Sequence, residues 1–393
     1  MPVAAAVKAA VGELPVITGN RVNRLDLAES ILTGTSLDFV SLARPFLADA
    51  DIIAKGRSGR RVNICLGCNQ ACIDRSLADA KVSCMVNPRA GRELDFPSGA
   101  TAIPLRTAVI GGGPAGLQAA SELAAAGHQV DLYEAASELG GQFRMACRVP
   151  GKEDYAETVR YFAAELDRLG VTVHRGRRIC DRDAALLSGY DGIIVASGAR
   201  PREVDIPRSG MPRVISYVDA FAEGALGERV VIIGGGGIAV DLAHLASHAP
   251  QRRAVTIVHR SKRTGANIGK STRWALIAAL RSQGVEIVPA VTYRRIESAG
   301  VRVLDAAGAD RLLPADTVVI AAGQEREPAV PSIVGRCGVW YRVAGGAREA
   351  VGLDAVRAFA EGLAAAYELT RSICSASAPR VAPGAAAGPG FGS

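Results

Sequence analysis

The chain lacks any long hydrophobic run. Nowhere do its 393 residues approach 18 uninterrupted apolar positions, so no membrane-spanning helix is expected. Residues 1–10 hold Lys8 inside a short Ala/Val run, without the basic front and apolar core of a signal peptide. Aromatic residues make up only 5%, and no Lys/Arg run is interleaved with them, so nucleic-acid binding is not expected. These absences predict a cytoplasmic protein.

The remaining composition describes a globular chain of two or three domains. Hydrophobic residues make up 49%, which is enough to bury sizeable cores. The formal net charge is +7, but the basic residues are dispersed along the chain, which suits an anionic substrate or cofactor. With no sign of secretion, the eight cysteines indicate a reducing compartment rather than a disulfide framework.

Four cysteines are crowded into one short segment with the spacing C-x2-C-x3-C-x11-C, namely Cys65, Cys68, Cys72 and Cys84. Iron–sulfur clusters need four thiolates, and their ligand runs have this form. Zinc is the main alternative, although its cysteine ligands usually come as two pairs. The spacing therefore favours an iron–sulfur cluster. The other cysteines are widely spaced and are expected to be buried or incidental thiols: Cys147, Cys180, Cys337 and Cys374.

An apolar strand at 106–110 runs into a glycine turn of the form G-x-G-x-x-G, with Gly111, Gly113 and Gly116. A helix is predicted over 115–126 and a second strand over 130–134. Such a turn lets the backbone and the helix N-terminus approach a pyrophosphate. Glu134 ends the second strand, where a carboxylate would accept hydrogen bonds from a ribose diol; the alternative is a solvated strand end.

A second copy of this strand–turn–helix–strand pattern follows further along the chain, with Gly234, Gly236 and Ala239 in the glycine positions. Its predicted helix covers 238–247 and its second strand 254–259. No carboxylate ends that strand; the sequence continues with His259, Arg260, Ser261, Lys262 and Arg263. Cations there suit a 2′-phosphate, so NADPH is predicted over NADH, the alternative being a solvated basic turn.

Two dinucleotide folds in tandem predict a flavin and a nicotinamide in one protein, with FAD in the first fold and NADPH in the second. NADPH supplies two electrons as a hydride and a cluster accepts one, so FAD would convert between them. Two short strands ending in Ala-x-Gly, at 193–198 and 318–323, would carry the chain between these domains. The N-terminal part shows strand–helix–strand alternation over 14–18, 25–32 and 38–42, then a helix over 47–60.

Several strings carry a resemblance to a known group of enzymes. Residues 41–49 read SLARPFLAD, residues 65–72 read CLGCNQAC, and residues 86–90 read VNPRA. Further matches are GQFRMA at 141–146, PGKE at 150–153, IGKSTRW at 268–274 and AGQE at 322–325. Over residues 11–370 the chain resembles the bacterial NADPH-dependent 2,4-dienoyl-CoA reductases, of the iron–sulfur flavoenzyme group that includes trimethylamine dehydrogenase.

The resemblance implies an α/β architecture: an FMN-binding TIM barrel, a [4Fe-4S] segment, then FAD and NAD(P) domains of Rossmann type. It implies that the four clustered cysteines ligate [4Fe-4S] and that electrons pass from NADPH to FAD, cluster, FMN and an enoyl-CoA-type substrate. Further contacts implied are Ala115, Glu134, Gln142 and Lys152 with FAD, His259 and Arg260 with the NADPH phosphate, and Arg21, Ala43 and Arg44 with FMN.

The expected boundaries are a C-terminal remnant of the barrel over 1–62, the cluster segment over 63–104, FAD-binding parts over 105–205 and 324–374, an inserted NAD(P)H domain over 206–323, and a disordered tail over 375–393. A full barrel needs roughly 250 residues. The family's catalytic Tyr and His are expected in the missing part, because residues 1–60 contain neither type. The FMN site is then incomplete. The alternatives are an electron-transfer subunit that feeds a separate flavoprotein, or an inactive truncated remnant.

Overall fold

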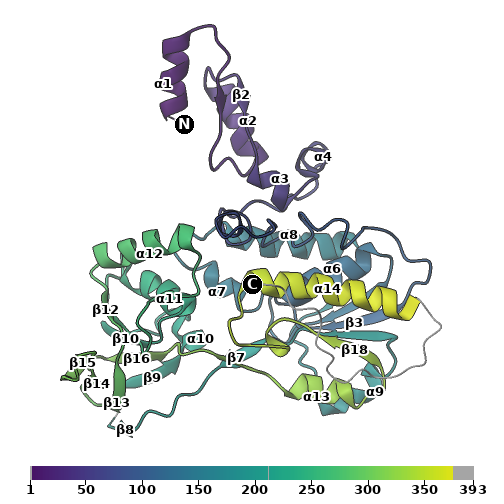
Figure 1. Ribbon diagram of the computed structural model, residues 1–393. Helices are drawn as coiled ribbons and strands as arrows, with labels where there is room; N and C mark the ends of the chain where they lie inside the picture. Colours follow the sequence, from purple (N-terminus) through teal and green to yellow (C-terminus); the bar gives the residue numbers. More distant parts are fainter. Residues whose placement is uncertain (1, 211, 375–393) are drawn as a thin grey trace.

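The computed structural model describes residues 2–210 and 212–374. Two α/β bodies lie side by side, and an N-terminal arm projects from them (Figure 1). The tail predicted over 375–393 lies outside the described residues. No helix in the described part of the chain combines the length and apolar character needed to cross a bilayer.

The first body is built on a five-stranded parallel sheet in the order β18-β6-β3-β4-β5. Helices α6, α8 and α14 cover one face, and the short helices α9 and α13 lie on the other (Figure 1). The strands are β3 (Arg106–Ile110), β4 (Gln129–Tyr133), β5 (Thr172–His174), β6 (Gly192–Val195) and β18 (Trp340–Val343). The helices are α6 (Pro114–Ala125), α7 (Phe143–Ala146), α8 (Tyr155–Arg168), η1 (Asp181–Asp183), α9 (Ala184–Leu187), α13 (Ala329–Gly335), η2 (Gly345–Ala347) and α14 (Ala355–Cys374).

The second body contains a five-stranded parallel sheet in the order β12-β11-β10-β16-β9 and a smaller sheet in the order β15-β14-β13-β8. Its strands are β8 (Arg208–Ser209), β9 (Arg213–Ser216), β10 (Arg229–Ile233), β11 (Ala254–Val258), β12 (Glu286–Val288), β13 (Thr292–Glu297), β14 (Gly300–Leu304), β15 (Asp310–Pro314) and β16 (Thr317–Ile320). Its helices are α10 (Tyr217–Ala220), α11 (Gly237–Ser247) and α12 (Lys270–Ser282). The prediction of two Rossmann-like domains is confirmed.

The two bodies are joined by chain segments that pair with each other. β7 (Ala199–Pro201) and β17 (Gln324–Arg326) run antiparallel, directly after the two strand ends that carry Gly198 and Gly323. All strands of the second body therefore lie in sequence between β6 and β18, which are neighbours in the first sheet. The first sheet is completed only after the chain has returned from the second body.

The N-terminal arm consists of α1 (Pro2–Val11), β1 (Ile17–Thr18), α2 (Leu25–Gly34), β2 (Phe39–Val40), α3 (Arg44–Ala48) and α4 (Ile52–Arg57). The strands β1 and β2 pair in parallel, as the alternation of the sequence indicates. The helix α1 was not predicted. The prediction of one helix over 47–60 is wrong, because the chain is extended at Asp49, with φ −149° and ψ 103°.

The break at Asp49 has a side-chain cause. Its carboxylate accepts hydrogen bonds from Lys55 Nζ at 2.7 Å and from the Asn63 backbone N–H at 2.9 Å. Both Asp49 and Lys55 are buried, so each charge is stabilised by forming an ion pair with the other. The cost of leaving either charge unpaired in the interior outweighs the hydrogen bonds of a continuous helix. The cysteine segment that follows holds one short helix, α5 (Ile73–Ser76), and is otherwise irregular, as predicted.

Candidate functional site: two nucleotide turns and a cysteine cavity

The first glycine turn joins β3 to α6, and each of its glycines has a different neighbour. Gly111 has φ +113°, and a Cβ on it would lie 2.2 Å from the Ala196 carbonyl oxygen. A Cβ on Gly116 would lie 1.7 Å from the Gly111 carbonyl oxygen. A Cβ on Gly113 would meet no protein atom within 4 Å. The first and third glycines are therefore required by the chain itself, whereas the second leaves room for a ligand to approach.

Glu134 lies beneath this turn, at the end of β4. Its Oε2 accepts a hydrogen bond from the Gly112 N–H at 2.6 Å, and its Oε1 accepts one from Ala136 N–H at 2.7 Å. The side chain is buried. Two backbone donors hold the carboxylate against the turn, where the ribose next to a bound pyrophosphate would lie. Ala115 is buried in the first turn of α6, and its carbonyl packs closely against Gly362 of α14.

The second turn, between β10 and α11, repeats this arrangement with a different residue below it. Gly234 has φ +145°, and a Cβ added to it would lie 2.2 Å from the Ala321 carbonyl oxygen. A Cβ added to Gly236 would meet only Asn267, at 3.6 Å. The imidazole of His259 packs under Gly235, as Glu134 does under Gly112. Its Nδ1 lies 2.9 Å from Ser261 Oγ and its Nε2 lies 2.7 Å from Thr264 Oγ1.

His259 is therefore a neutral counterpart of Glu134. Burial lowers its pKa, so the ring is uncharged at neutral pH. Arg260, next in sequence, is exposed. The first turn thus has a carboxylate beneath it, and the second has an uncharged ring and a cation. The two turns therefore differ in the charge that they present to a bound nucleotide.

Gln142 and Lys152 lie where the two bodies meet. Gln142 Nε2 donates to the Ala199 carbonyl oxygen at 2.7 Å, and its Oε1 accepts from Gln324 Nε2 at 2.5 Å. Lys152 Nζ contacts both carboxylate oxygens of Asp241 on α11, at 2.6 and 2.7 Å. Asp241 was not among the predicted site residues. Nothing in the local sequence marks it, because its partner comes 89 residues earlier.

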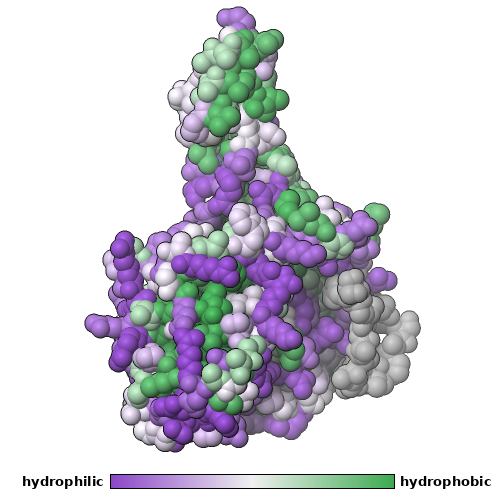
Figure 2. Space-filling model, turned by 60° about the vertical axis from the view of Figure 1, so that its left-hand side comes forward, coloured by the Kyte–Doolittle hydropathy of each residue, from purple (hydrophilic) through white to green (hydrophobic). Residues whose placement is uncertain are grey.

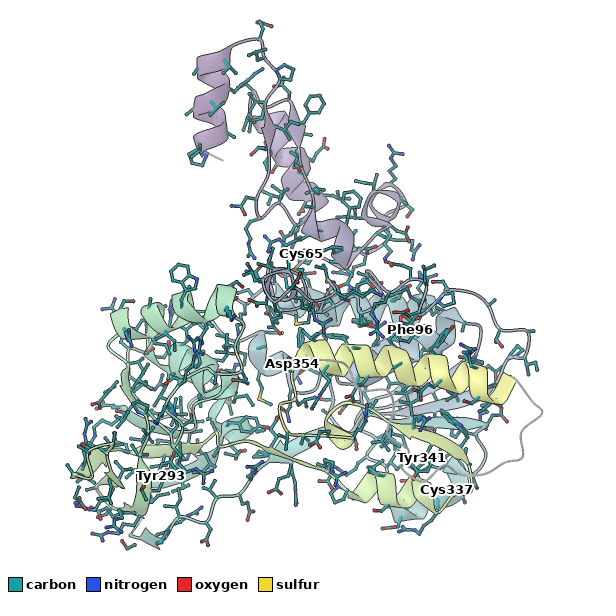
Figure 3. All side chains as sticks on the ribbon, viewed as in Figure 1. Cys65, Phe96, Tyr293, Cys337, Tyr341 and Asp354 are labelled. Carbon is teal, nitrogen blue, oxygen red and sulfur yellow. The ribbon has the colours of Figure 1, made fainter. Side chains whose placement is uncertain are left out.

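The four clustered cysteines line one small cavity together with Arg44, Asn69 and apolar side chains, namely Leu47, Leu66, Ala71, Met85 and Val86. The thiols are free, and Figure 3 shows Cys65 between the arm and the two bodies. Burial raises the pKa of Cys68 to about 11 and that of Cys84 to about 12, so loading a metal centre must displace protons. Among the described residues, no three His, Cys, Asp or Glu side chains gather as for a single metal ion.

The donor set of this cavity fits an iron–sulfur cluster. Four thiols line it, without imidazole or carboxylate, and the Oδ1 of Asn69 is occupied by a hydrogen bond from Arg44. Each iron of a four-iron cluster takes one thiolate. Gly67 is required within the run, because it has φ +64° and its Cβ would lie 1.7 Å from Arg21 Nη1. The backbone N–H groups of such a loop and the surrounding apolar shell are the features that tune a cluster's potential.

The three residues predicted to contact FMN lie beside the cysteines. Arg21 has φ +60°, an unusual conformation for a residue with a side chain, and its Nη1 donates to the Leu66 carbonyl oxygen at 3.3 Å. Arg44 Nη1 donates to Asn69 Oδ1 at 2.6 Å, and Ala43 precedes α3 as its N-cap. All three therefore lie where the arm meets the cysteine segment.

A link between the cysteine segment and the second body was missed by sequence reasoning. Asp74, two residues after Cys72, accepts a hydrogen bond through Oδ1 from the Ser271 N–H at 2.9 Å. Ser271 belongs to the first turn of α12, where a carboxylate interacts favourably with the helix dipole. Gly269 packs against this carboxylate so closely that any Cβ would clash with it. The cysteine loop and the second nucleotide body are therefore in direct contact.

Comparisons with known proteins agree with this arrangement. A family model described as pyridine nucleotide-disulphide oxidoreductase matches residues 105–335. A metal reductase of Desulforamulus reducens is 32% identical over 80% of this chain and 52% of its own length. A cinnamate reductase of Clostridium sporogenes is 30% identical over 79% of this chain and 47% of its own length.

Among solved structures, that of a 2-naphthoyl-CoA reductase in complex with 2-naphthoyl-CoA is similar, with a TM-score of 0.85 and 26% identity. The match covers 93% of this chain and 56% of that one. The chain thus spans about half the length of the curated relatives that it matches. The likeness extends through the two nucleotide bodies and beyond the residues that the family model matches.

Proposed function

Because the chain belongs to the pyridine nucleotide-disulphide oxidoreductase family, we propose that it uses NADPH, FAD and a [4Fe-4S] cluster to deliver single electrons to an acceptor. Family membership makes it a flavin-dependent oxidoreductase that uses a nicotinamide nucleotide. The observation that carries the finer proposal is the difference between the two turns, together with four thiols in one cavity. FAD, when bound, accepts two electrons as a hydride and can release them singly.

Each part of the chain has a task in this proposal. Glu134 orients the FAD ribose, while the N-terminus of α6 binds the pyrophosphate. His259 leaves room for a 2′-phosphate because it brings no negative charge, and Arg260 supplies a cation for it. Lys152 and Asp241 hold the two bodies together, and Gln142 connects them through Gln324. Cys65, Cys68, Cys72 and Cys84 hold the cluster.

The nucleotide preference is tested with the Arg260→Ala variant. NADPH is expected to bleach the bound flavin of the natural protein at lower concentrations than NADH. In the variant the KM for NADPH should rise by about 10- to 100-fold, since a charge-assisted contact to phosphate is lost, while the KM for NADH stays unchanged. Arg294→Gln, an exposed arginine of β13, is the matched control. An NADH preference in the natural protein would overturn the assignment of Arg260.

We further propose that the electrons finally reduce the C=C bond of an enoyl-CoA-type substrate. The resemblance to dienoyl-CoA reductases supports this, as do a cinnamate reductase and a 2-naphthoyl-CoA reductase among the similar proteins. Arg21, Ala43 and Arg44 would then contact FMN on the far side of the cluster. The NADPH and FAD half of such an enzyme corresponds to the two nucleotide bodies.

A second candidate is an electron-transfer module for a separate flavoprotein. The arm exposes an apolar surface, and hydrophobic side chains are prominent on it in Figure 2. Ile17 and Phe39, directly paired across β1 and β2, are 64% and 55% exposed. Within the described residues β1 and β2 form a two-stranded sheet, so each has a free edge at which a further strand can pair. Their exposed apolar face is a surface that a partner can cover. A flavoprotein partner with parallel strands would cover it.

The acceptor is tested by supplying NADPH to this chain alone. Reduction of ferricyanide is expected, because this reaction needs only the nucleotide bodies. Turnover of a 2,4-dienoyl-CoA, followed by loss of the diene absorbance, is expected to be at least about 100-fold slower, since residues 1–60 hold no Tyr or His to protonate the substrate. Turnover of the dienoyl-CoA at the ferricyanide rate would contradict the proposed division of labour.

A further inference from the structure

The second nucleotide turn is covered by a side chain, whereas the first turn is open. A Cβ on Gly113 of the first turn would meet no protein atom within 4 Å. At the second turn the Asn267 side chain lies over the equivalent position, with its Oδ1 3.6 Å from the place of a Cβ on Gly236. Asn267 Oδ1 also accepts a hydrogen bond from the Gly237 N–H at 3.1 Å. The second turn is therefore closed by a residue of the chain itself.

This hydrogen bond occupies a donor that a nucleotide needs. Gly237 is the first residue of α11, and the N–H groups at the start of a helix have no partner within the helix. A pyrophosphate at this turn binds to such groups. The amide oxygen of Asn267 therefore stands in the place of a phosphate oxygen, and a nucleotide must displace it. Because Asn267 is exposed, it can leave the turn without opening the core.

The segment that carries Asn267 also contacts the cysteine loop. Ser271, in the first turn of α12, donates its N–H to Asp74 Oδ1 at 2.9 Å. The other carboxylate oxygen of Asp74, Oδ2, is buried and has no hydrogen-bond partner within residues 2–210 and 212–374. The start of α12 therefore stabilises a carboxylate that is otherwise only half satisfied. A shift of α12 requires Asp74 either to follow it or to lose this hydrogen bond.

Asp74 is in turn joined to a predicted cluster ligand. It belongs to α5, whose N-cap is Cys72, and the Ser76 N–H donates to the Cys72 carbonyl oxygen at 2.9 Å. The Asp74 N–H donates to the Asn69 carbonyl oxygen at 3.0 Å, which ties α5 to the loop between Cys68 and Cys72. A displacement of Asp74 is therefore passed to Cys72 through one helical turn.

We propose that Asn267 and Asp74 are the two ends of a latch that opposes nucleotide binding at the second turn and holds the cysteine loop in place. When a nucleotide displaces Asn267, the start of α12 moves and the hydrogen bond from Ser271 to Asp74 weakens. When the nucleotide leaves, both contacts form again, so the latch favours release of the oxidised nucleotide. Two sites linked in this way change each other's binding free energies by the same amount.

This inference rests on the proposed function, since it takes the nucleotide to bind at the second turn and the cysteines to hold the cluster. The test uses ADP-ribose 2′-phosphate, which has the pyrophosphate but no nicotinamide ring and so exchanges no electrons. Its binding to the protein loaded with flavin and cluster is measured by calorimetry. ADP-ribose is measured in parallel, so that the result does not depend on a preference for NADPH or NADH.

Removing either end of the latch is expected to tighten binding of the fragment. Asn267→Ala should tighten it by about 3- to 10-fold, because the phosphate no longer competes with a neutral hydrogen bond. Asp74→Ala should tighten it by about 2- to 5-fold. The double variant should bind no more tightly than Asn267→Ala alone, since both changes remove the same latch. Ser76→Ala, at an exposed position of α5, is the matched control and should leave the affinity unchanged.

Hydrogen exchange gives a second readout, on the cysteine loop itself. In the natural protein the fragment should speed up amide exchange over residues 73–77 by about 5-fold, because α5 loses its contact with α12. In Asn267→Ala this exchange should already be fast and should not respond to the fragment. Asn267 is exposed, so this variant is expected to fold whatever the effect of Asp74→Ala on stability.

The outcomes separate the latch from the proposed function. Weaker fragment binding in Asn267→Ala would overturn the latch, because Asn267 would then be a contact to the nucleotide. Additive effects in the double variant, or exchange over residues 73–77 that does not respond to the fragment, would also overturn it and leave the proposed function intact. Failure of NADPH and NADH to bleach the flavin would instead contradict the proposed function, yet fragment-dependent exchange in α5 would still support the latch.

Discussion

Replacing Cys68 by serine is expected to remove the iron from the protein while leaving the flavin in place. Cys68 lines the cysteine cavity, and a serine hydroxyl is a poor ligand for iron. The iron content should fall from about four atoms per chain to a trace amount. The broad absorption around the flavin bands should be lost with it. The two nucleotide turns lie outside the cavity, so FAD content should change by less than about twofold.

Three measurements check this expectation on anaerobically purified protein. Metal analysis gives iron and zinc per chain, the visible spectrum gives flavin, and low-temperature EPR after reduction by NADPH gives the paramagnetic cluster. The EPR signal should be absent in Cys68→Ser although NADPH still bleaches the flavin. Cys337→Ser is the matched control, since Cys337 is a half-buried free thiol remote from the cavity (Figure 3).

Three results would contradict the assignment of a cluster to these four thiols. Stoichiometric zinc without iron in the natural protein would show that the four thiols form a zinc site. Full iron content in Cys68→Ser would show that the iron is bound elsewhere. Equal loss of iron in Cys337→Ser would point to general destabilisation rather than to ligation.

A methyl group on Gly113 is expected to weaken FAD binding by at least about 100-fold, or about 2.7 kcal/mol, without destabilising the apoprotein. The backbone at Gly113 has φ −80°, which alanine adopts without strain, and its Cβ would meet no protein atom within 4 Å. The methyl group would instead stand where the pyrophosphate approaches the turn. The methyl group therefore weakens FAD binding by obstructing the ligand and not by disturbing the fold.

Gly116→Ala is the matched contrast for this prediction. Its Cβ would lie 1.7 Å from the Gly111 carbonyl oxygen, so β3 and α6 would have to separate. Its apoprotein should lose about 3 kcal/mol or more of unfolding free energy. Thermal unfolding of both apoproteins and flavin titration of the folded ones give the comparison. Unchanged FAD affinity in Gly113→Ala, or equal destabilisation in both variants, would contradict the assigned role.

The glycine turns and the elements around them could be predicted from sequence because their causes are local. An apolar strand, three glycines and a following helix constrain one another within about a dozen residues. The same reasoning correctly predicted that the cysteine segment would hold little regular structure. It failed at residues 47–60, where Asp49 interrupts the expected helix. The carboxylate accepts hydrogen bonds from Lys55 and from the Asn63 N–H, and these compete with a continuous helix. Apolar periodicity along the sequence does not reveal such contacts.

The sequence by itself determined the two nucleotide folds, the candidate ligands in the cysteine run and the different residues that end the two second strands. Only the tertiary structure decided that His259 lies beneath its turn as Glu134 does, that Lys152 meets Asp241, and that Asp74 meets α12. It also brought Trp274 into one cavity with the cationic side chains of Lys262, Arg263, Arg273 and Arg281. The physical reason is the distance along the chain over which each effect acts. Glycine conformation and apolar periodicity act between near neighbours in sequence. The other contacts form only when elements distant in sequence pack together and their buried polar and charged groups must find partners.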